Sequence, residues 1–562
     1  MDSWAVVNDA LVRKALAEFT HERILGPVAV GKRYAVGRYS FDARRYPLNH
    51  WDIASVERDD DGPVDALEFI TEFHEQLGIA REMLPVYLEE ISSTLASAAY
   101  KLSKPDLTAA DLVTADFQTI EAAMTEGHPC FVANNGRLGF GHTDYLAYAP
   151  ETGAGVRLTW IATRRDRTTV SCSSSLTYDT LLRAELGDDV LSRFAAVADP
   201  AEYVYLPVHP WQWDNKISIT FAADIASGHI VHLGSTDDIY QPQQSIRTFF
   251  NRSEPSRCYV KTALSVLNMG FMRGLSPSYM AATPAINDWV HSVVSNDVVL
   301  KRYGFSVLRE IAAAGYHNRY YENATDTTSP YRKMLSALWR ESPVPSLEPG
   351  ERLATMASLL HVDRHGSSLA AALVRASGLA PADWLRAYVD AYLIPLLHSF
   401  YAYELVFMPH GENLILVLRD AIPIRVIMKD IAEEIAVLDP ATPVPAEAER
   451  VRADVPDDEK LLSIFTDVFD CIFRFLAPLL DSEGLLTPAE FWTVVGESIR
   501  DYQSTTPELA EAFAKYDIFA PSFALSCLNR LQLRNNQQMV DLTNISNSLQ
   551  YADTLDNPLS CG

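Results

Sequence analysis

The chain has 562 residues, of which 48% are hydrophobic and 21% are charged, close to the composition of ordinary globular proteins. Its length is several times that of a typical domain, so we expect two or three substructures rather than one core. Acidic residues (73) outnumber Lys and Arg (47), which gives a formal net charge of −26. The composition excludes a fibrous or disordered chain, and the lack of a basic block argues against nucleic acid as a partner.

The first residues, the apolar stretches and the cysteines indicate where in the cell the protein is expected. The chain begins Met1-Asp2-Ser3-Trp4 and lacks the basic start and apolar run of a secretory signal. The most apolar stretch, between Asp390 and Glu404, is too short to cross about 30 Å of hydrocarbon and predicts a buried helix. The six cysteines lack the spacing of a zinc site or a disulfide framework. We expect a cytoplasmic protein with reduced thiols and no membrane partner.

The spacing of apolar residues changes twice along the chain. From about 64 to 124, apolar residues three and four apart predict a largely helical N-terminal layer. From about 127 to 275, short apolar runs broken by Gly, Pro and Asn predict a sheet-rich region. Helical patterns then return, with one apparent hairpin among them, at 352–376, 382–407, 458–480, 488–502 and 508–535. The expected fold class is therefore α+β, with a mostly helical C-terminal part that carries a small sheet.

One common nucleotide motif is matched only by chance. Residues 26–32 have the phosphate-loop spacing, but Arg33 stands where a magnesium-binding Ser or Thr is required. Pro27 and two valines also occupy a loop that needs free N–H groups. A nucleotide site, if there is one, must be of another kind.

The strongest local pattern is a loop followed by a β-hairpin. His410-Gly411-Glu412-Asn413 precedes an apolar run, a turn over residues 419–423, and a second run that ends at Asp430. Pairing Leu418 with Ile424 makes paired residue numbers sum to 842, which places Glu412 opposite Asp430 and Asn413 opposite Lys429. Kinase-type sites hold Mg²⁺ with an Asn and an acidic residue arranged in this way. An ordinary hairpin with capped polar ends is the alternative.

A second pattern gathers cations among apolar residues. Ser245, Arg247 and Thr248 precede a turn, Lys261 follows it, and Arg273 ends the next apolar stretch. Arg and Lys side chains beside hydroxyls suit a triphosphate, because they neutralise charge and donate hydrogen bonds. The register of this hairpin is uncertain by one residue. Taken alone, each cation is more often a salt-bridge partner than a ligand-binding group, but their clustering weakens that alternative.

Two further segments, 127–140 and 206–213, mix polar and aromatic residues and are interpreted as shaped loops. The first contains His128 and Arg137, and the second contains His209 between Val208 and Pro210. A His in such a setting is as often a packed, hydrogen-bonded residue as a ligand.

Taken together and in this order, these segments resemble the NRPS-independent siderophore synthetases, the family of aerobactin synthetase-like enzymes. The resemblance extends from about residue 80 to the end. The residues of these segments are most similar to those of the subgroup that joins hydroxamate precursors, as in desferrioxamine and alcaligin synthesis. The resemblance is carried by GHP…NNGRLGF at 127–140, LPVHPWQW at 206–213, QQSIRTFFN at 243–251, KTALSVLNMGFMRGLSPSYM at 261–280 and HGENLILVLRD…IMKDI at 410–431.

The resemblance implies an ATP- and Mg²⁺-dependent ligase that forms an amide through an acyl-adenylate, with release of pyrophosphate and AMP. It also implies a cupped-hand fold, usually dimeric, with a thumb over 1–125, fingers over 126–325 and a palm over 326–562. The implied catalytic residues are Lys261, Arg273 and His410, and Asp430, Asn413 and Glu412 would serve the metal. ATP would bind His128, Arg137, Ser245, Arg247, Thr248, Lys261, Glu412 and Asn413. The substrate would bind Arg273, His410, His209, Arg474 and Arg534.

The chain departs from the family pattern at several positions. Phe131, Val132 and Asn135 stand where relatives have a second His-Pro and a Lys, while Met408 and Glu412 replace residues common in relatives. Losing a cation and gaining apolar residues suits a longer, less charged substrate than citrate. We therefore expect an N-hydroxy-N-succinyl-diamine to be joined into a hydroxamate siderophore, with macrocyclisation.

Other functions remain open at this stage. A citrate-activating synthetase would use the same chemistry on another substrate. A kinase-like phosphotransferase would account for the arrangement of Asn413 and Asp430. A non-catalytic ATP- or siderophore-binding protein is the third alternative. The Asn- and Gln-rich segment 529–538 has two interpretations: it binds hydroxamates through Arg530 and Arg534, or it caps a helix.

Overall fold

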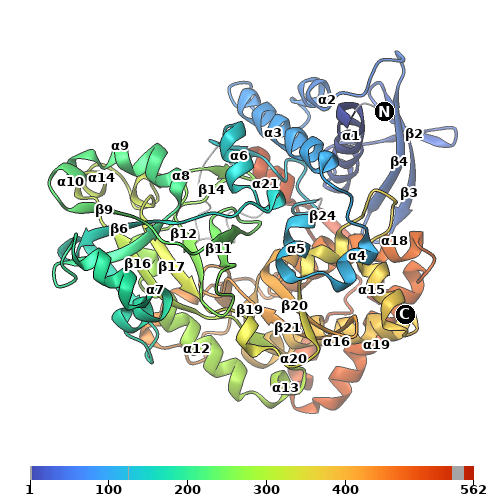
Figure 1. Cartoon of the computed structure of the whole chain (residues 1–562). Coiled ribbons are helices and arrows are strands. Elements are labelled where there is room, and N and C mark those ends of the chain that lie inside the picture. The colour runs from blue at the N-terminus through green and yellow to red at the C-terminus, as the bar shows by residue number, and fades with distance from the viewer. Residues whose placement is uncertain (1–2, 125, 535–549, 562) are drawn as a thin grey trace.

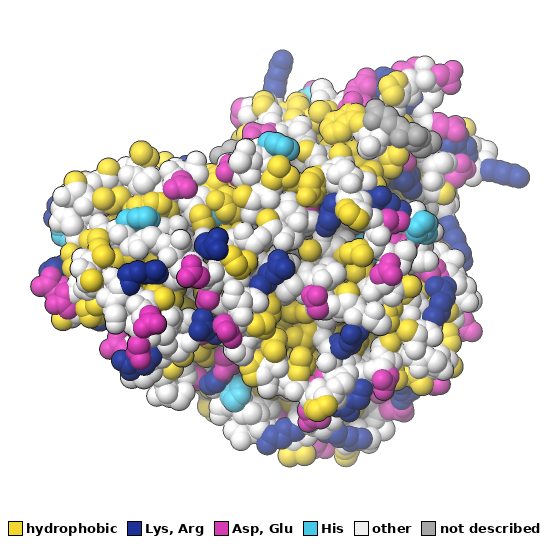
Figure 2. Space-filling view, viewed as in Figure 1, with side chains coloured by type: hydrophobic (Ala, Val, Ile, Leu, Met, Phe, Trp, Pro, Cys, Tyr) yellow, Lys and Arg dark blue, Asp and Glu magenta, His cyan; other side chains and the backbone are white. Residues whose placement is uncertain are grey.

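The structure, a computed structural model, describes residues 3–124, 126–534 and 550–561. Figure 1 shows the N-terminal part at the upper right, a sheet-rich middle part at the left and the C-terminal part at the lower right. Helices and sheets occur in all three parts, which confirms the α+β prediction. On the face seen in Figure 2, basic and acidic side chains are interspersed, so neither sign of charge forms a large patch there.

The N-terminal part combines helices with a sheet that the sequence analysis missed. Residues 28–58 form four antiparallel strands that are only partly buried: β1 is exposed throughout, and in β3 Tyr39 and Phe41 are buried while Asp42 is exposed. This half-polar pattern hides the strands from a search for apolar runs. The phosphate-loop match falls in the β1–β2 hairpin. The elements are α1 Ser3–His21, β1 Val28–Val30, β2 Arg33–Val36, β3 Tyr39–Tyr46, β4 His50–Arg58, α2 Ala66–Phe73 and α3 Leu84–Ser103.

Two short helices link this part to the rest of the chain. They are α4 (Ala109–Thr114) and α5 (Phe117–Ala123), and they confirm the helical prediction for this stretch. Their buried residues Leu112 and Ile120 belong to the C-terminal core. The division of the chain at residue 125 stays a prediction.

The middle part is rich in sheet, as predicted. A six-stranded antiparallel sheet has the order β10-β11-β12-β17-β16-β7, and two three-stranded sheets, β8-β6-β9 and β14-β13-β5, accompany it. The last of these joins the 127–140 segment to the stretch before Arg273, since Asn268 pairs with Arg137. The strands are β5 Arg137–Leu138, β6 Thr159–Arg164, β7 Thr168–Cys172, β8 Tyr203–Val208, β9 Ile230–Ser235, β10 Tyr240–Pro242, β11 Thr248–Asn251, β12 Tyr259–Thr262, β13 Leu267–Asn268, β14 Phe271–Met272, β16 Glu310–Tyr316 and β17 Ser336–Arg340.

The C-terminal part is mostly helical and carries a four-stranded sheet of order β15-β21-β20-β18. Two predicted helices are wrong in part, because residues 351–355 pair with β20 and residues 522–526 pair with β24 (Tyr551–Asp556) as strands. Sheet pairing here outweighs a helix-like spacing. The elements are β15 Ser306–Val307, β18 Glu351–Thr355, α15 Leu369–Ser377, α16 Pro381–Tyr403, β20 Leu414–Arg419, β21 Ile422–Met428, α18 Arg474–Ser482, α19 Pro488–Thr505, β23 Ser522–Ser526 and α21 Leu528–Arg534.

The apolar stretch after Asp390 forms most of α16 and is buried in the C-terminal core, as predicted. Within the described ranges, we find no helix with the length and apolar character needed to span a membrane. Five of the cysteines are free thiols; Cys130 and Cys471 have their sulfur atoms 3.5 Å apart.

A buried ion pair joins α1 to the C-terminal part. The Arg474 guanidinium donates to both carboxylate oxygens of Glu18, at 3.0 and 2.8 Å, and lies 2.7 Å from Asp470. Both side chains of the Arg474–Glu18 pair are almost fully buried. Such a pair adds little net stability, but removing one partner leaves an uncompensated charge in the interior.

We therefore expect Glu18→Ala to destabilise the fold by about 3–5 kcal/mol. Thermal and denaturant unfolding followed by circular dichroism would measure the loss. Asp553→Ala is the matched control, because its pair with Arg23 also involves the N-terminal part but is exposed, and such pairs are worth about 0–1 kcal/mol. Equal effects of the two substitutions would contradict the prediction.

Candidate active site

The loop and hairpin at 410–430 form largely as the sequence predicts. Leu414 pairs with Met428, and the Lys429 amide donates to the Asn413 carbonyl oxygen at 2.9 Å, so Asn413 lies opposite Lys429. Beyond Val417 a bulge shifts the register, and Leu418 pairs with Pro423 rather than Ile424. The bulge lies at the far end of the hairpin, so the predicted alignment at the functional end is retained.

The second hairpin brings Thr248 opposite Lys261 in neighbouring strands β11 and β12. Ser245 donates to the Thr248 hydroxyl at 2.9 Å, which fixes the turn before β11. The Arg247 guanidinium donates to the backbone oxygens of Gly274 and Arg273, at 2.7 and 3.2 Å. Arg247 thus holds the segment that carries Arg273 against this hairpin.

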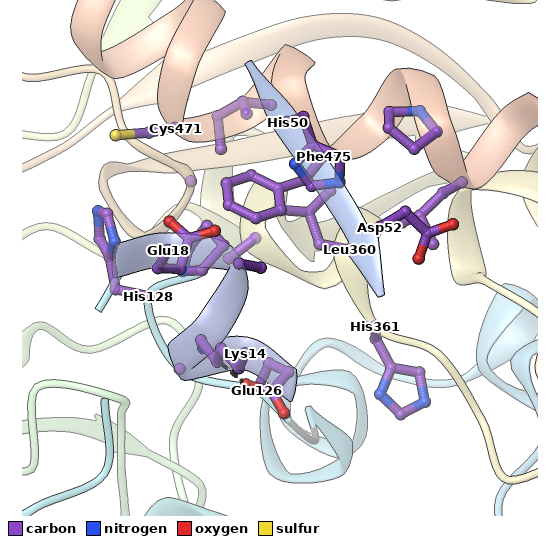
Figure 3. A pocket seen from close by; sticks show the side chains of 18 of the residues that line it. Lys14, Glu18, His50, Asp52, Glu126, His128, Leu360, His361, Cys471 and Phe475 are labelled. Carbon is purple, nitrogen blue, oxygen red and sulfur yellow. Dashed lines mark hydrogen bonds and ion pairs between the residues drawn. The ribbon is translucent and has the colours of Figure 1, made fainter. Parts of the chain in front are cut away.

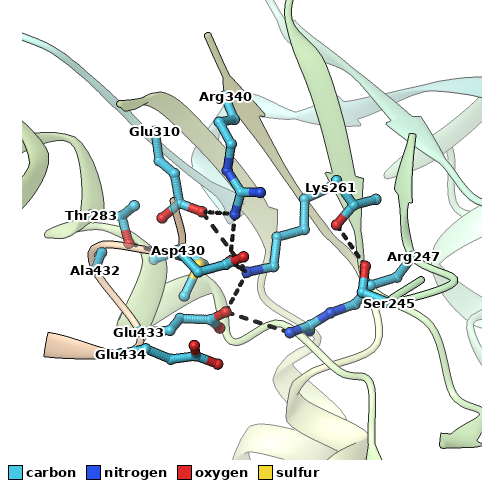
Figure 4. Close-up of polar contacts among 12 residues, drawn as sticks. Ser245, Arg247, Lys261, Thr283, Glu310, Arg340, Asp430, Ala432, Glu433 and Glu434 are labelled. Atoms are coloured by element: carbon cyan, nitrogen blue, oxygen red, sulfur yellow. Dashed lines mark hydrogen bonds and ion pairs between the residues drawn. The ribbon is translucent and has the colours of Figure 1, made fainter. Parts of the chain in front are cut away.

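Lys261 lies at the centre of a buried ion network between the middle and C-terminal parts (Figure 4). Its ammonium is 2.6 Å from Asp430, is ion-paired with Glu433, and is 3.8 Å from Glu310. Arg340 donates to Glu310 at 2.8 Å and is also paired with Asp430. Although burial alone would raise it, the two cations hold the pKa of Asp430 well below its usual range.

Arg273 and His410 lie beside this network with unused hydrogen-bonding capacity. Arg273 donates to the Asn268 oxygen at 3.2 Å, but its Nε has no partner, and burial together with Arg247 lowers its pKa to about 10. His410 Nδ1 also has no partner, and burial lowers the pKa of His410 to about 4. At neutral pH, Arg273 is therefore a cation and His410 is a neutral imidazole.

Oxygen ligands suited to a cation gather on the hairpin side. Asn413 donates to the Met408 oxygen at 2.9 Å and is hydrogen-bonded to Glu434. Burial and the nearby Asp430 raise the pKa of Glu434 to about 7. The described part of the chain contains no group of three or more His, Cys, Asp or Glu placed to hold a metal. The residues thus fit Mg²⁺ that brings phosphate ligands with it, since protein sites often supply only one or two carboxylates.

The remaining sequence-predicted residues lie around or away from this centre. His128 approaches it, with its ring centroid 5.5 Å from that of His410. Arg137 forms a buried two-point ion pair with Glu151, at 2.7 and 3.0 Å. His209 is fully buried among aromatic rings, where its Nδ1 accepts from the Trp211 amide at 3.0 Å and its Nε2 has no partner.

Two predicted substrate residues are not brought to the centre. Arg474 is occupied by Glu18 and Asp470, and Arg534 is exposed at the end of α21. In the 529–538 segment, Asn529 is buried and donates to the Cys130 oxygen at 2.8 Å, whereas residues 535–538 lie outside the described part of the chain.

The Phe131 and Val132 side chains are buried, and Val132 belongs to the N-terminal core. Their apolar character therefore helps to pack the 127–140 loop, and it is weaker evidence for an apolar substrate than the sequence analysis assumed.

Three network residues were missed: Glu310, Arg340 and Glu433. Glu310 and Arg340 are single charges at the ends of apolar strands, directly opposite each other in register, and Glu433 follows Asp430 by three positions. A single charged residue at the end of an apolar strand was the available signal, because a buried charge needs an oppositely charged or hydrogen-bonding partner.

Two protein-family models and a known synthase match this chain. Residues 116–361 match the model of the IucA / IucC family, and residues 382–541 match a model described as ferric iron reductase FhuF-like transporter. Putrebactin synthase of Shewanella sp. (strain MR-4) is 50% identical over 577 aligned residues, covering 99% of this chain and 91% of the relative.

Solved structures share the fold over the whole chain. Aerobactin synthetase IucC of a hypervirulent pathotype of Klebsiella pneumoniae has a TM-score of 0.87 and 29% identity, covering 100% of this chain and 98% of that one. ATP-bound aerobactin synthetase IucA of the same pathotype has a TM-score of 0.75 at 16% identity, covering 100% and 99%.

The fold is thus that of a siderophore-synthetase-like protein. The chain belongs to the IucA / IucC family of NRPS-independent siderophore synthetases, which confirms the resemblance.

Proposed function

We propose that the chain is an ATP-dependent ligase that activates the carboxylate of an N-hydroxy-N-succinyl-diamine and joins it to an amine. The observation that carries this proposal is the meeting of two sets of groups at one junction. Cations from the middle part face carboxylates of the 410–434 segment: Lys261 contacts Asp430 and Glu433, Arg247 pairs with Glu433, and Arg273 lies near Glu412 and Glu434. This pairing suits a triphosphate that is held by cations on one side and by a metal on the other.

The reaction has two displacements. A carboxylate oxygen of the substrate attacks the α-phosphorus, and the bond to the bridging oxygen breaks so that pyrophosphate leaves. The amine nitrogen then attacks the acyl carbon, the acyl–oxygen bond breaks so that AMP leaves with the electron pair, and the amine proton passes to water. Both steps build negative charge on phosphate oxygens, which fixed cations in a buried site stabilise.

Each residue has a part that follows from its position. Lys261 and Arg273 contact the phosphates, and Ser245 and Thr248 supply hydroxyl donors. The unpartnered Arg273 Nε and the neutral His410 ring orient the substrate carboxylate by donating hydrogen bonds. Asp430 and Asn413 would hold Mg²⁺, which when bound neutralises phosphate charge and aligns pyrophosphate as a leaving group.

The proposal of a hydroxamate substrate rests on the sequence identity to putrebactin synthase. Putrebactin synthase is 50% identical across nearly the whole chain, well above the other similarities described, so a substrate of that relative's class is favoured over citrate. The site also agrees, since the cations that meet the phosphates leave few for a tricarboxylate. Homodimerisation, the macrocyclic product and the length of the diamine stay predictions.

Product analysis tests the reaction class and the substrate together. With ATP, Mg²⁺ and N-hydroxy-N-succinylcadaverine or its putrescine homologue, we expect AMP, pyrophosphate and amide-linked oligomers by mass spectrometry. ADP would instead establish a phosphotransferase, and no turnover of any candidate would favour a binding protein. A higher kcat/KM with citrate than with the hydroxamate would overturn the substrate while keeping the ligase.

Arg273→Ala should reduce turnover by at least roughly 100-fold, or about 2.7 kcal/mol, with the fold retained. Lys261→Ala is a weaker test, because it strands Asp430, Glu433 and Glu310 in the interior and destabilises the fold as well. Arg302→Ala, at an exposed Arg, is the matched control. If a folded Arg273→Ala enzyme works within a few-fold of wild type, Arg273 does not contact the reacting groups.

Asp430→Asn should raise the Mg²⁺ concentration needed for half-maximal activity several-fold, because one anionic ligand is lost while its shape is kept. Asp420→Asn makes the same chemical change at an exposed turn of the same hairpin and should leave the titration unchanged. An identical Mg²⁺ titration for wild type and Asp430→Asn would remove Asp430 as a metal ligand.

A further inference from the structure

A chamber of about 500 Å³ lies between α1, β4, the loop at 127–129 and the C-terminal helices (Figure 3). Its volume falls within the range of about 300–1,000 Å³ that is typical of small-molecule sites. One wall is formed by Gly411 and Glu412, and His128, which also lines it, has its ring against His410. The chamber therefore shares the Gly411–Glu412 wall with the candidate active site, whereas Lys261, Arg273 and Asp430 do not line it.

The walls of the chamber are mainly apolar, with a few polar groups. Figure 3 shows Phe475 and Leu360 at its middle, Lys14 and Glu126 on one side, and Asp52 on another. Lys14 is paired with Glu126 at 3.1 Å. An apolar channel of this kind accepts methylene groups, which gain free energy on leaving water.

The lining of the chamber contains more carboxylates than cations. Two cations, Arg13 and Lys14, face four carboxylates; the lining acids are Glu18, Asp52, Glu126 and Glu412. Of these, Glu18 is neutralised by Arg474 and Glu126 by Lys14, while Arg13 pairs with Asp9. The exposed Asp52 and the half-buried Glu412 have no close ion pair among those described, although Arg13 and Arg44 lie near Asp52, and Arg273 and Lys429 lie near Glu412. The lining acids outnumber the lining cations, which favours a positively charged ligand over an anionic one.

Two buried histidines supply further hydrogen-bonding groups. His50 and His128 are both more than nine-tenths buried, and the Nδ1 atom of each has no hydrogen-bond partner. Burial lowers the pKa of both rings well below the usual range, so they are uncharged and do not repel a cation. Buried polar atoms are nearly always paired, so these two unpaired nitrogens indicate a ligand with polar groups along its length.

We propose that this chamber binds the acceptor amine, a primary ammonium on a methylene chain that bears a polar hydroxamate group. This inference rests on the proposed function, because it assigns the second substrate of the same reaction. The amine loses one proton to water, its nitrogen attacks the acyl carbon beside the 410–412 loop, and AMP leaves with the electrons of the broken acyl–oxygen bond.

The test separates the two substrates by chemistry. The acyl donor is N-hydroxy-N-succinylcadaverine with its amine acetylated, and the acceptor is N-hydroxy-N-acetylcadaverine, which has an amine and no carboxylate. ATP–pyrophosphate exchange with the donor measures activation alone, and capture of the activated donor by hydroxylamine measures acyl transfer to a nucleophile too small to need the chamber. Amide formation with the acceptor measures use of the chamber.

Leu360→Trp fills the chamber, and Leu379→Trp is the matched control at an exposed leucine between α15 and α16. We expect Leu360→Trp to raise the KM for the acceptor at least tenfold, with exchange and hydroxylamine capture within about twofold of wild type. Asp52→Asn, which removes a lining carboxylate without adding bulk, should raise the same KM several-fold and serves if Leu360→Trp does not fold.

The outcomes distinguish this inference from the proposed function. Absence of pyrophosphate exchange in the wild-type enzyme with any donor would contradict the proposed function itself. If the wild type exchanges normally, a loss of exchange in folded Leu360→Trp would assign the chamber to the donor or nucleotide and overturn the inference. An unchanged acceptor KM in both variants would overturn it as well.

Discussion

The buried contact between the Lys261 ammonium and Asp430 is the interaction on which the site depends. Lys261 comes from the sheet of the middle part and Asp430 from the C-terminal hairpin, so their 2.6 Å contact joins two parts of the chain that have separate cores. Charges in the interior are tolerated only when they are paired, which explains why Glu310, Arg340 and Glu433 surround them. The cations are therefore held in position before any substrate arrives.

Under the proposed function, this arrangement prepares the protein for phosphate chemistry. The acids that now contact Lys261 and Arg247 can be replaced by phosphate oxygens or shared with a metal, so that binding exchanges one set of charge pairs for another. Fixed charges need little reorganisation during the reaction, and they act more strongly where water is excluded. Under the further inference, the chamber on the other side of the 410–412 loop would hold the cationic acceptor apart from the phosphates.

The sequence predicted those parts of the candidate site that are formed by residues close together in the sequence. The alignment of Asn413 with Lys429 followed from counting along two short strands, although the apolar pattern could not reveal the bulge at Leu418. The ion pair of Arg474 with Glu18 could not be predicted, because Glu18 lies on α1, 456 residues away in the sequence, and only tertiary packing brings the two together. The strands of residues 28–58 were missed because β1 is exposed and β3 and β4 mix buried with exposed residues, so that no continuous apolar run marks them.

The most direct test of the phosphate-binding role of Lys261 and Arg273 is a crystal structure of the protein with a stable acyl-adenylate analogue, such as the acyl sulfamide of adenosine. We predict that the group replacing the α-phosphate contacts Lys261 and Arg273, with the acyl carbon next to His410. An analogue whose phosphate-replacing group lies in the chamber beside Phe475, away from Lys261, would contradict it.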